Sequence, residues 1–288
     1  MRILITGAFG QLGFALSKVL DKVSHYEIIR TGRSIPIGQK GIFLDIQNKV
    51  HLKEVVKSTE PELIINLAAM TNVDACEQYP ELAKEINIAG LQHICDSFDG
   101  KIIHLSTDYV FDGESGPYEE EDQTCPISVY GKTKLASERI LLNNNPNHLV
   151  IRGNVIYDYS TLSNASFLNW VVSSLKEDKE IKVVEDQINN PTWARSMADV
   201  INLCISNDLN GVIHWGDADY VSRFDFSKMI AERFSLNSKL IKPILTKELC
   251  QTAPRPLQSG LMTTKIVKIL DVIPPSISDC LQEISILK

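Results

Sequence analysis

Short apolar runs alternate with amphipathic stretches along the first half of the chain. Residues 2–6 (RILIT) predict a strand, and residues 11–20 (QLGFALSKVL) predict a helix with its apolar positions on one face. Further strands are expected at 26–31, 41–44, 62–69, 101–107 and 148–152, and further helices at 50–58, 80–98 and 128–142. Because strands that alternate with helices form parallel sheets covered on both faces, we expect a doubly wound, Rossmann-type α/β fold.

The alternation of strands and helices becomes less regular in the second half, where prolines divide the chain into short elements. Two helices remain clear there, at 167–177 and 224–234. The second carries an apolar stripe that we interpret as core packing, formed by Phe226, Met229, Ile230 and Phe234. We expect a dinucleotide-binding domain made of residues 1–152 with returning segments near 185–215, and a smaller substrate-binding lobe made mainly of residues 153–288.

Composition excludes several classes of protein. The 288 residues are 44% hydrophobic and 23% charged, with a net charge of −7, which disfavours a nucleic-acid partner. No apolar run reaches the roughly 18 residues of a membrane span, and the first run is too short for a secretory signal. The six cysteines are spaced singly and the histidines show no ligand spacing. We therefore expect reduced thiols, a cytoplasmic protein and no metal site.

A glycine loop follows the first expected strand and leads into the first expected helix. Gly7 allows a tight turn, Gly10 allows the backbone to approach a pyrophosphate, and Gly13 allows close packing of the helix. The spacing is G-x-x-G-x-x-G, and turns also collect glycine, so the context matters as much as the spacing. We assign to a dinucleotide site the loop residues Gly7, Phe9, Gly10, Gln11, Leu12 and Gly13.

The end of the second strand bears on which dinucleotide is bound. A carboxylate there would pair with the ribose of NAD, but the stretch IIRTGRS contains none. Arg33 is the candidate for holding a 2′-phosphate, and its alternative is a solvated surface position. NADP(H) is therefore preferred, and use of NAD(H) stays open. Asp45 and Ile46, just after the third strand, are expected near the adenine.

Two residues one helical turn apart are candidates for acid–base chemistry. Tyr130 and Lys134 are four positions apart and share a helix face. The tyrosine pKa is ordinarily about 10, and a neighbouring ammonium favours the phenolate, so we expect Lys134 to lower it. Thr107 ends the fifth expected strand, where parallel sheets bind ligands. The Y-x-x-x-K spacing alone is common by chance.

Taken together, the motifs resemble an extended short-chain dehydrogenase/reductase. They are the glycine loop, NLAA (66–69), INIAG around Asn87, STDYVFDG (106–113) and Y-x-x-x-K. Four stretches narrow the resemblance to the dTDP-4-dehydrorhamnose reductase family: AAMTNVDACE (68–77), STDYVFDG, DQINNPTWA (186–194) and RPLQSGL (255–261).

This resemblance implies reduction of the C4 ketone of a nucleotide-linked 4-keto-6-deoxy sugar, most simply dTDP-4-dehydro-L-rhamnose. Tyr130 would supply a proton to the developing alkoxide, Lys134 would hold the nicotinamide ribose, and Thr107 would polarise the carbonyl. Asn87 would support Lys134, with a surface position as its alternative. The resemblance also implies a homodimer, and it adds to the cofactor site Leu67, Ala68, Ala69 and Thr71.

The sugar site implied by the resemblance includes Asp108 and Tyr109. Arg255 is a candidate clamp for the substrate pyrophosphate, with a loop anchor as its alternative, and Trp193 is expected beside the nucleotide or in the core. One departure concerns IRGNVIY (151–157), because the family often has L-R-T-S-W-V-Y there. Val155 therefore replaces a tryptophan that flanks the sugar, and the identity of the sugar stays open.

Three alternatives accompany this hypothesis. The first is a reductase of a different nucleotide-linked 4-keto sugar. The second is a nucleotide-sugar epimerase or dehydratase, although the dehydratases typically have T-D-E where this chain has Thr107, Asp108 and Tyr109. The third is a non-catalytic, NADP-binding regulatory subunit.

Overall fold

A seven-stranded, entirely parallel sheet forms the centre of the computed structural model, which describes residues 1–159 and 166–286. The strand order is β11-β6-β5-β4-β1-β2-β3. The strands are β1 (Arg2–Thr6), β2 (Glu27–Gly32), β3 (Ile42–Phe43), β4 (Leu63–Asn66), β5 (Lys101–Thr107), β6 (Leu149–Gly153) and β11 (Gly211–Trp215). Chain order reverses between β1 and β4, so the doubly wound fold predicted from the sequence is confirmed.

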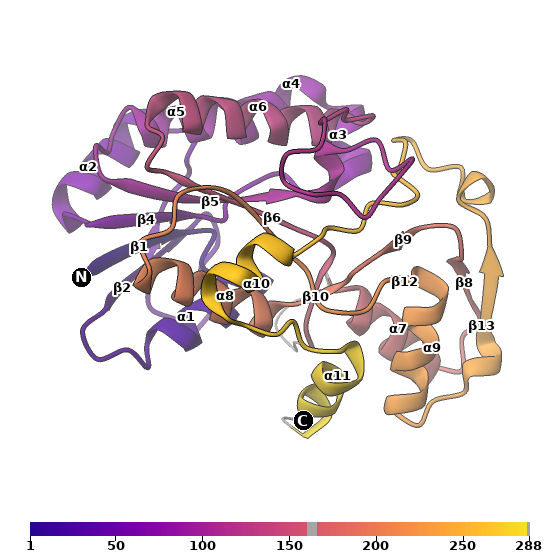
Figure 1. Ribbon diagram of the computed structural model, residues 1–288. Helices are drawn as coiled ribbons and strands as arrows, with labels where there is room; N and C mark the ends of the chain where they lie inside the picture. Colours follow the sequence, from indigo (N-terminus) through magenta and orange to yellow (C-terminus); the bar gives the residue numbers. More distant parts are fainter. Residues whose placement is uncertain (160–165, 287–288) are drawn as a thin grey trace.

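Helices cover both faces of this sheet (Figure 1). One layer contains α1 (Gln11–Leu20), α8 (Ala194–Ser206) and α10 (Thr264–Leu270), and the opposite layer contains α2 (Lys49–Thr59), α3 (Val73–Gln78), α4 (Pro80–Lys84), α5 (Gly90–Cys95) and α6 (Val129–Asn144). Successive side chains of β1 point to opposite faces of the sheet. Ile3 and Ile5 therefore join the core under α1 and α8, whereas Leu4 joins the core under α2 and α5.

The strands predicted in the first half all occur, shifted by a few residues at most. The helix predicted over 80–98 differs, because α4 and α5 are joined by a π-helical turn, Glu85–Ala89. Single π-helical turns inside α-helices frequently mark functional sites. The strand β11 was not identified from the sequence as a separate element.

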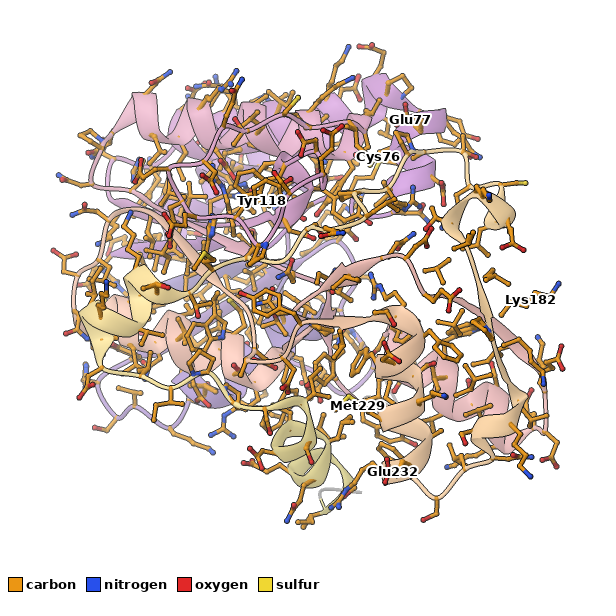
Figure 2. The ribbon with its side chains drawn as sticks, turned by 45° about the vertical axis from the view of Figure 1, so that its right-hand side comes forward. Cys76, Glu77, Tyr118, Lys182, Met229 and Glu232 are labelled. Carbon is orange, nitrogen blue, oxygen red and sulfur yellow. The ribbon has the colours of Figure 1, made fainter. Side chains whose placement is uncertain are left out.

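A second hydrophobic core lies beyond the sheet. It is built by α7 (Phe167–Lys176), α9 (Arg223–Arg233) and α11 (Ile277–Ile286), together with the parallel pair β8 (Ile181–Val184) and β13 (Ile241–Ile244). Figure 2 shows Lys182 on β8 and Met229 and Glu232 on α9 in this part of the molecule. Two short pairs lie between the cores: β7 (Ile156–Tyr157) with β10 (Thr192–Trp193), and β9 (Ile188–Asn189) with β12 (Val221–Ser222). The domain boundaries given above remain a prediction.

The apolar stripe predicted on the 224–234 helix faces this second core. Phe226 and Ile230 are fully buried, and Met229 and Phe234 pack against the cluster from partly buried positions. Among the described residues, every helix is too short or too polar to cross a bilayer.

Candidate active site

One cavity of about 570 Å³ runs along the carboxyl ends of the sheet strands. The glycine loop, the residues after β2, β3, β4 and β6, the end of β5 and the start of α6 all contribute to it. Of the residues assigned from the sequence, seventeen line it: Gly7, Gly10, Gln11, Leu12, Gly13, Arg33, Asp45, Ile46, Leu67, Ala68, Ala69, Thr71, Thr107, Asp108, Tyr109, Tyr130 and Val155. This is the edge at which open parallel sheets bind ligands.

The glycines of the loop allow close backbone contacts, of Gly7 with Ala68 and of Gly13 with Gly7. Gly7 has a φ of +66°, and a Cβ there would lie 2.9 Å from the amide nitrogen of Ala68. A Cβ on Gly13 would lie 2.4 Å from the Gly7 carbonyl oxygen. Gly10 precedes α1 without a side-chain cap, and the first turn of α1 has no acidic residue. The N-terminal amides of α1 are therefore available to an anion.

One buried donor in this wall lacks an acceptor. Gln11 lines the cavity, and its Nε2 is buried without a hydrogen-bond partner among the described residues. A buried amide donor without an acceptor costs about 1–3 kcal/mol. This donor, the free helix terminus and the glycine cradle together fit the pyrophosphate of a dinucleotide.

Arg33 and Arg30 differ in what they can bind. Arg30 forms an ion pair with Asp21, whereas the exposed Arg33 lines the cavity directly after β2. Asp45, also in the wall, accepts a hydrogen bond from the Gln47 amide at 3.0 Å. Phe9 is outside the lining, and ideal Cβ positions on Gly32 and Gly41 would contact its ring.

Tyr130 lies on the first turn of α6, and two capping contacts fix that turn. Ser128 Oγ accepts from the Gly131 amide at 3.2 Å, and Glu77 Oε2 accepts from the Val129 amide at 3.0 Å. Figure 2 shows Glu77 beside Cys76 on α3. The Tyr130 ring meets the Tyr109 ring edge to face, with centroids 5.6 Å apart.

Burial raises the pKa of Tyr130 above its ordinary value, and a hydrogen bond with the Thr107 side chain acts in the opposite direction. The tyrosine is therefore a protonated phenol at neutral pH, ready to donate. In this structure the Lys134 ammonium is directed toward His104 and the Leu105 carbonyl, so its lowering of this pKa stays a prediction.

Lys134 is buried and points toward β5. Its Nζ donates to the Leu105 carbonyl at 2.6 Å and lies 3.0 Å from His104 Nε2, and it does not line the cavity. Burial lowers the pKa of Lys134 to about 8, while Glu138 acts to raise it. Asn87, expected to support Lys134, instead bonds to Met70 and to Thr133 Oγ1.

Asp108 joins the end of β5 to a distant segment. Its Oδ1 accepts from Thr107 Oγ1 at 2.9 Å, and its Oδ2 accepts from Ser259 Oγ at 2.5 Å. Burial raises the pKa of Asp108 to about 6, against the lowering effect of these two hydroxyl hydrogen bonds. The carboxyl group therefore fixes the hydroxyl that faces Tyr130.

Two predicted substrate contacts lie elsewhere. Trp193 is 6% exposed within the second core, and its Nε1 donates to Asp158 Oδ1 at 3.2 Å. Arg255 is outside the lining, and its guanidinium forms an ion pair with Asp74 at 2.7 Å. These positions correspond to the core and loop-anchor alternatives.

Sequence reasoning missed one cation in the wall. Arg223 is the first residue of α9 and lines the cavity. The only signal available was its place immediately before a predicted helix. Other lining residues not assigned beforehand are Gly32, Leu44, Val73, Ile86, Leu105, Ser106, Gly153, Asn154 and Ile156.

Comparison with known proteins gives a consistent set of relatives. The model of the RmlD substrate binding domain matches residues 1–285. The dTDP-4-dehydrorhamnose reductase of Aggregatibacter actinomycetemcomitans is 33% identical, covering 95% of this chain and 94% of that protein. Methionine adenosyltransferase 2 subunit beta of Xenopus tropicalis is 30% identical, covering 93% and 82%. The crystal structure of dTDP-4-dehydrorhamnose reductase from Bacillus anthracis in complex with NADP superposes with a TM-score of 0.91 at 29% identity, covering 100% and 99%.

Proposed function

The chain belongs to the RmlD substrate binding domain family, and we propose that it uses NADPH to reduce the C4 ketone of a nucleotide-linked 4-keto-6-deoxy sugar. The preferred reaction converts dTDP-4-dehydro-L-rhamnose to dTDP-L-rhamnose. One observation carries the proposal: a single cavity is lined by the glycine loop, which would hold a pyrophosphate, and by Thr107 and Tyr130.

In this reaction a hydride adds to the carbonyl carbon and a proton adds to its oxygen. Bound NADPH supplies the hydride. Tyr130 donates its phenolic proton to the oxygen as negative charge develops there, and solvent later restores that proton. Thr107 donates a hydrogen bond to the same oxygen when its hydroxyl turns away from Asp108, which stabilises the charge in a water-poor site.

Several features of the chain support NADPH as the reductant. Arg33 follows β2 without a competing carboxylate on the stretch 28–34 and offers a planar fork to a 2′-phosphate. Gln11 and the N-terminus of α1 would hold the pyrophosphate. The B. anthracis reductase was crystallised with NADP. Use of NADH and a cytoplasmic location remain predictions from the sequence, and a homodimer remains a prediction from the family.

The direct test is turnover with defined ketones. A dTDP-4-keto-6-deoxy sugar, generated in situ by a dehydratase and an epimerase, is mixed with the purified protein, and loss of NADPH is followed by its near-ultraviolet absorbance. We expect NADPH loss that depends on the sugar. UDP- and GDP-linked ketones serve as comparators, and no loss with any of the three would rule the proposal out.

A second candidate is a non-catalytic, NADP-binding regulatory subunit, which the similarity to methionine adenosyltransferase 2 subunit beta favours. Such a protein would bind dinucleotide without consuming it in the same assay. An epimerase or dehydratase would retain tightly bound nicotinamide during purification. A freely exchanging cofactor with net NADPH loss separates the reductase from both.

A further inference from the structure

Most arginines of this protein are paired. Among residues 1–159 and 166–286, the guanidinium groups that lack a hydrogen-bond acceptor are those of Arg33, Arg139 and Arg223. Arg139 is exposed on the surface of α6. The other two line the cavity, so the site contains two cations that the described residues leave unneutralised.

These two arginines belong to opposite ends of the cavity. Arg33 follows β2, whereas Arg223 interacts electrostatically with Asp108 and Tyr109 at the end of β5. Three strand spacings separate β2 from β5 in the sheet, roughly 14 Å at 4.8 Å per spacing. A single phosphate group cannot neutralise both. A dinucleotide phosphate at Arg33 therefore leaves Arg223 for a second ligand.

The surroundings of Arg223 hold the side chain in place without neutralising it. Ser222 caps α9 by accepting from the Asp225 amide at 3.0 Å, which fixes the backbone at Arg223. The guanidinium carbon lies 5.3 Å from the centre of the Phe167 ring. An arginine packed against an aromatic ring keeps the N–H groups at its edge available for an anion.

The nearby acidic groups are already engaged. Asp108 takes hydrogen bonds from Thr107 and Ser259, and Asp74 pairs with Arg255. Partial burial lowers the pKa of Arg223, whose guanidinium has no direct counter-ion among the described residues. A partly buried guanidinium with no acceptor among the described residues gains free energy when a ligand brings an anion to it.

We propose that Arg223 binds the diphosphate of the nucleotide-linked substrate. The inference rests on the proposed function, which requires such a diphosphate in this cavity. The planar guanidinium fork matches two phosphate oxygens. Arg255, the candidate from the sequence, is instead an anchor that ties segment 255–261 to Asp74.

The experiment compares two ligands that differ only in the diphosphate. Binding of dTDP and of thymidine is measured by calorimetry on protein saturated with NADP⁺, for the wild type and for Arg223→Met, Arg223→Lys and Arg139→Met. We expect Arg223→Met to weaken dTDP binding about 10- to 100-fold and to leave thymidine binding unchanged. Arg223→Lys recovers part of the loss, because it restores the charge without the fork, and Arg139→Met matches the wild type.

Three results would overturn the inference. They are a wild type that does not prefer dTDP to thymidine, an Arg223→Met variant that keeps the wild-type preference, and a variant that loses both ligands equally. NADP⁺ affinity and thermal unfolding of each variant show whether it is folded. Turnover of the ketone is measured separately. If the wild type reduces the ketone but Arg223→Met keeps the preference for dTDP over thymidine, only this inference is refuted. A wild type that reduces none of the ketones refutes the proposed function.

Discussion

Asn87 holds both backbone polar groups of Met70. Its Oδ1 accepts from the Met70 amide at 2.8 Å, and its Nδ2 donates to the Met70 carbonyl at 3.2 Å and to Thr133 Oγ1 at 3.0 Å. Asn87 lies on the π-helical turn, Met70 lies in the cavity-lining segment 67–71, and Thr133 lies on α6. One buried amide therefore couples the cavity wall at residues 67–71 to the helix that carries Tyr130.

Replacing this amide is expected to loosen the cofactor wall. Asn87→Ala leaves the Met70 amide without its acceptor and leaves the Met70 carbonyl with only the weak Cys76 thiol donor, a loss of about 1–3 kcal/mol. We expect the KM for NADPH to rise about tenfold, with a smaller change in the KM for the sugar. Steady-state kinetics with each substrate varied in turn measures this. Asn207→Ala removes an exposed amide–carbonyl bond to Leu203 and should leave both constants unchanged; equal effects of the two variants would contradict the coupling.

Removing the phenolic hydroxyl of Tyr130 tests whether this residue is the proton donor. Tyr130→Phe keeps the ring and its contact with Tyr109, but it cannot donate a proton. We expect kcat to fall about 10²- to 10⁴-fold, with NADP⁺ affinity retained. Stopped-flow turnover and a separate dinucleotide titration measure the two quantities. Retained turnover in this variant would mean that another group protonates the alkoxide.

The glycine cradle predicts a ranking of two alanine substitutions. A Cβ on Gly13 would lie 2.4 Å from the Gly7 carbonyl oxygen and 2.6 Å from Ala8 Cα, whereas a Cβ on Gly10 would meet only the Gly7 oxygen, at 3.3 Å. Because backbone atoms can shift only slightly to relieve a clash, Gly13→Ala should lower the free energy of unfolding by about 1–3 kcal/mol or more. Gly10→Ala should lower it by less. Urea unfolding of both variants gives the order, and the reverse order would contradict the geometry.

The buried carboxyl of Asp108 predicts a pH dependence of stability. Its pKa is about 6 in the folded chain, against an ordinary value of 3.8, so the folded state binds more protons between these values. The contribution of Asp108 to the free energy of unfolding is greatest below pH 3.8, and it is lost as the pH rises through about 6. Between pH 5 and pH 8 its contribution to the free energy of unfolding should fall by about 1 kcal/mol.

Asp108→Asn isolates this contribution, because asparagine does not titrate. The difference in unfolding free energy, wild type minus variant, should be about 1 kcal/mol lower at pH 8 than at pH 5. Urea unfolding at the two pH values measures it. A difference that stays constant would mean that the carboxyl titrates normally in the folded chain.

Local patterns were enough to predict the fold and the place of the glycine loop in the cavity. The strands and the glycine loop depend on neighbouring residues: Gly7 needs a positive φ, and β1 needs apolar side chains on both faces. The same holds for Thr107, which is placed by the end of its own strand.

Side-chain partners far along the chain were not predictable in this way. The spacing of Tyr130 and Lys134 puts both on one helix face, but His104 and the Leu105 carbonyl determine where the ammonium points. Arg255 has the right chemistry for a phosphate, yet a carboxylate 181 residues earlier occupies it. Arg223 lines the cavity and lacks such a partner among the described residues, which no local pattern reveals.

The ties between Asp108 and Ser259 and between Asp74 and Arg255 have a consequence during synthesis. The tied residues are 151 and 181 positions apart, so the segment that holds Asp108 in the cavity wall leaves the ribosome late. The central strands β1 to β6 are translated well before it. The Asp108 side of the cavity therefore gains these ties only when about the last tenth of the chain emerges.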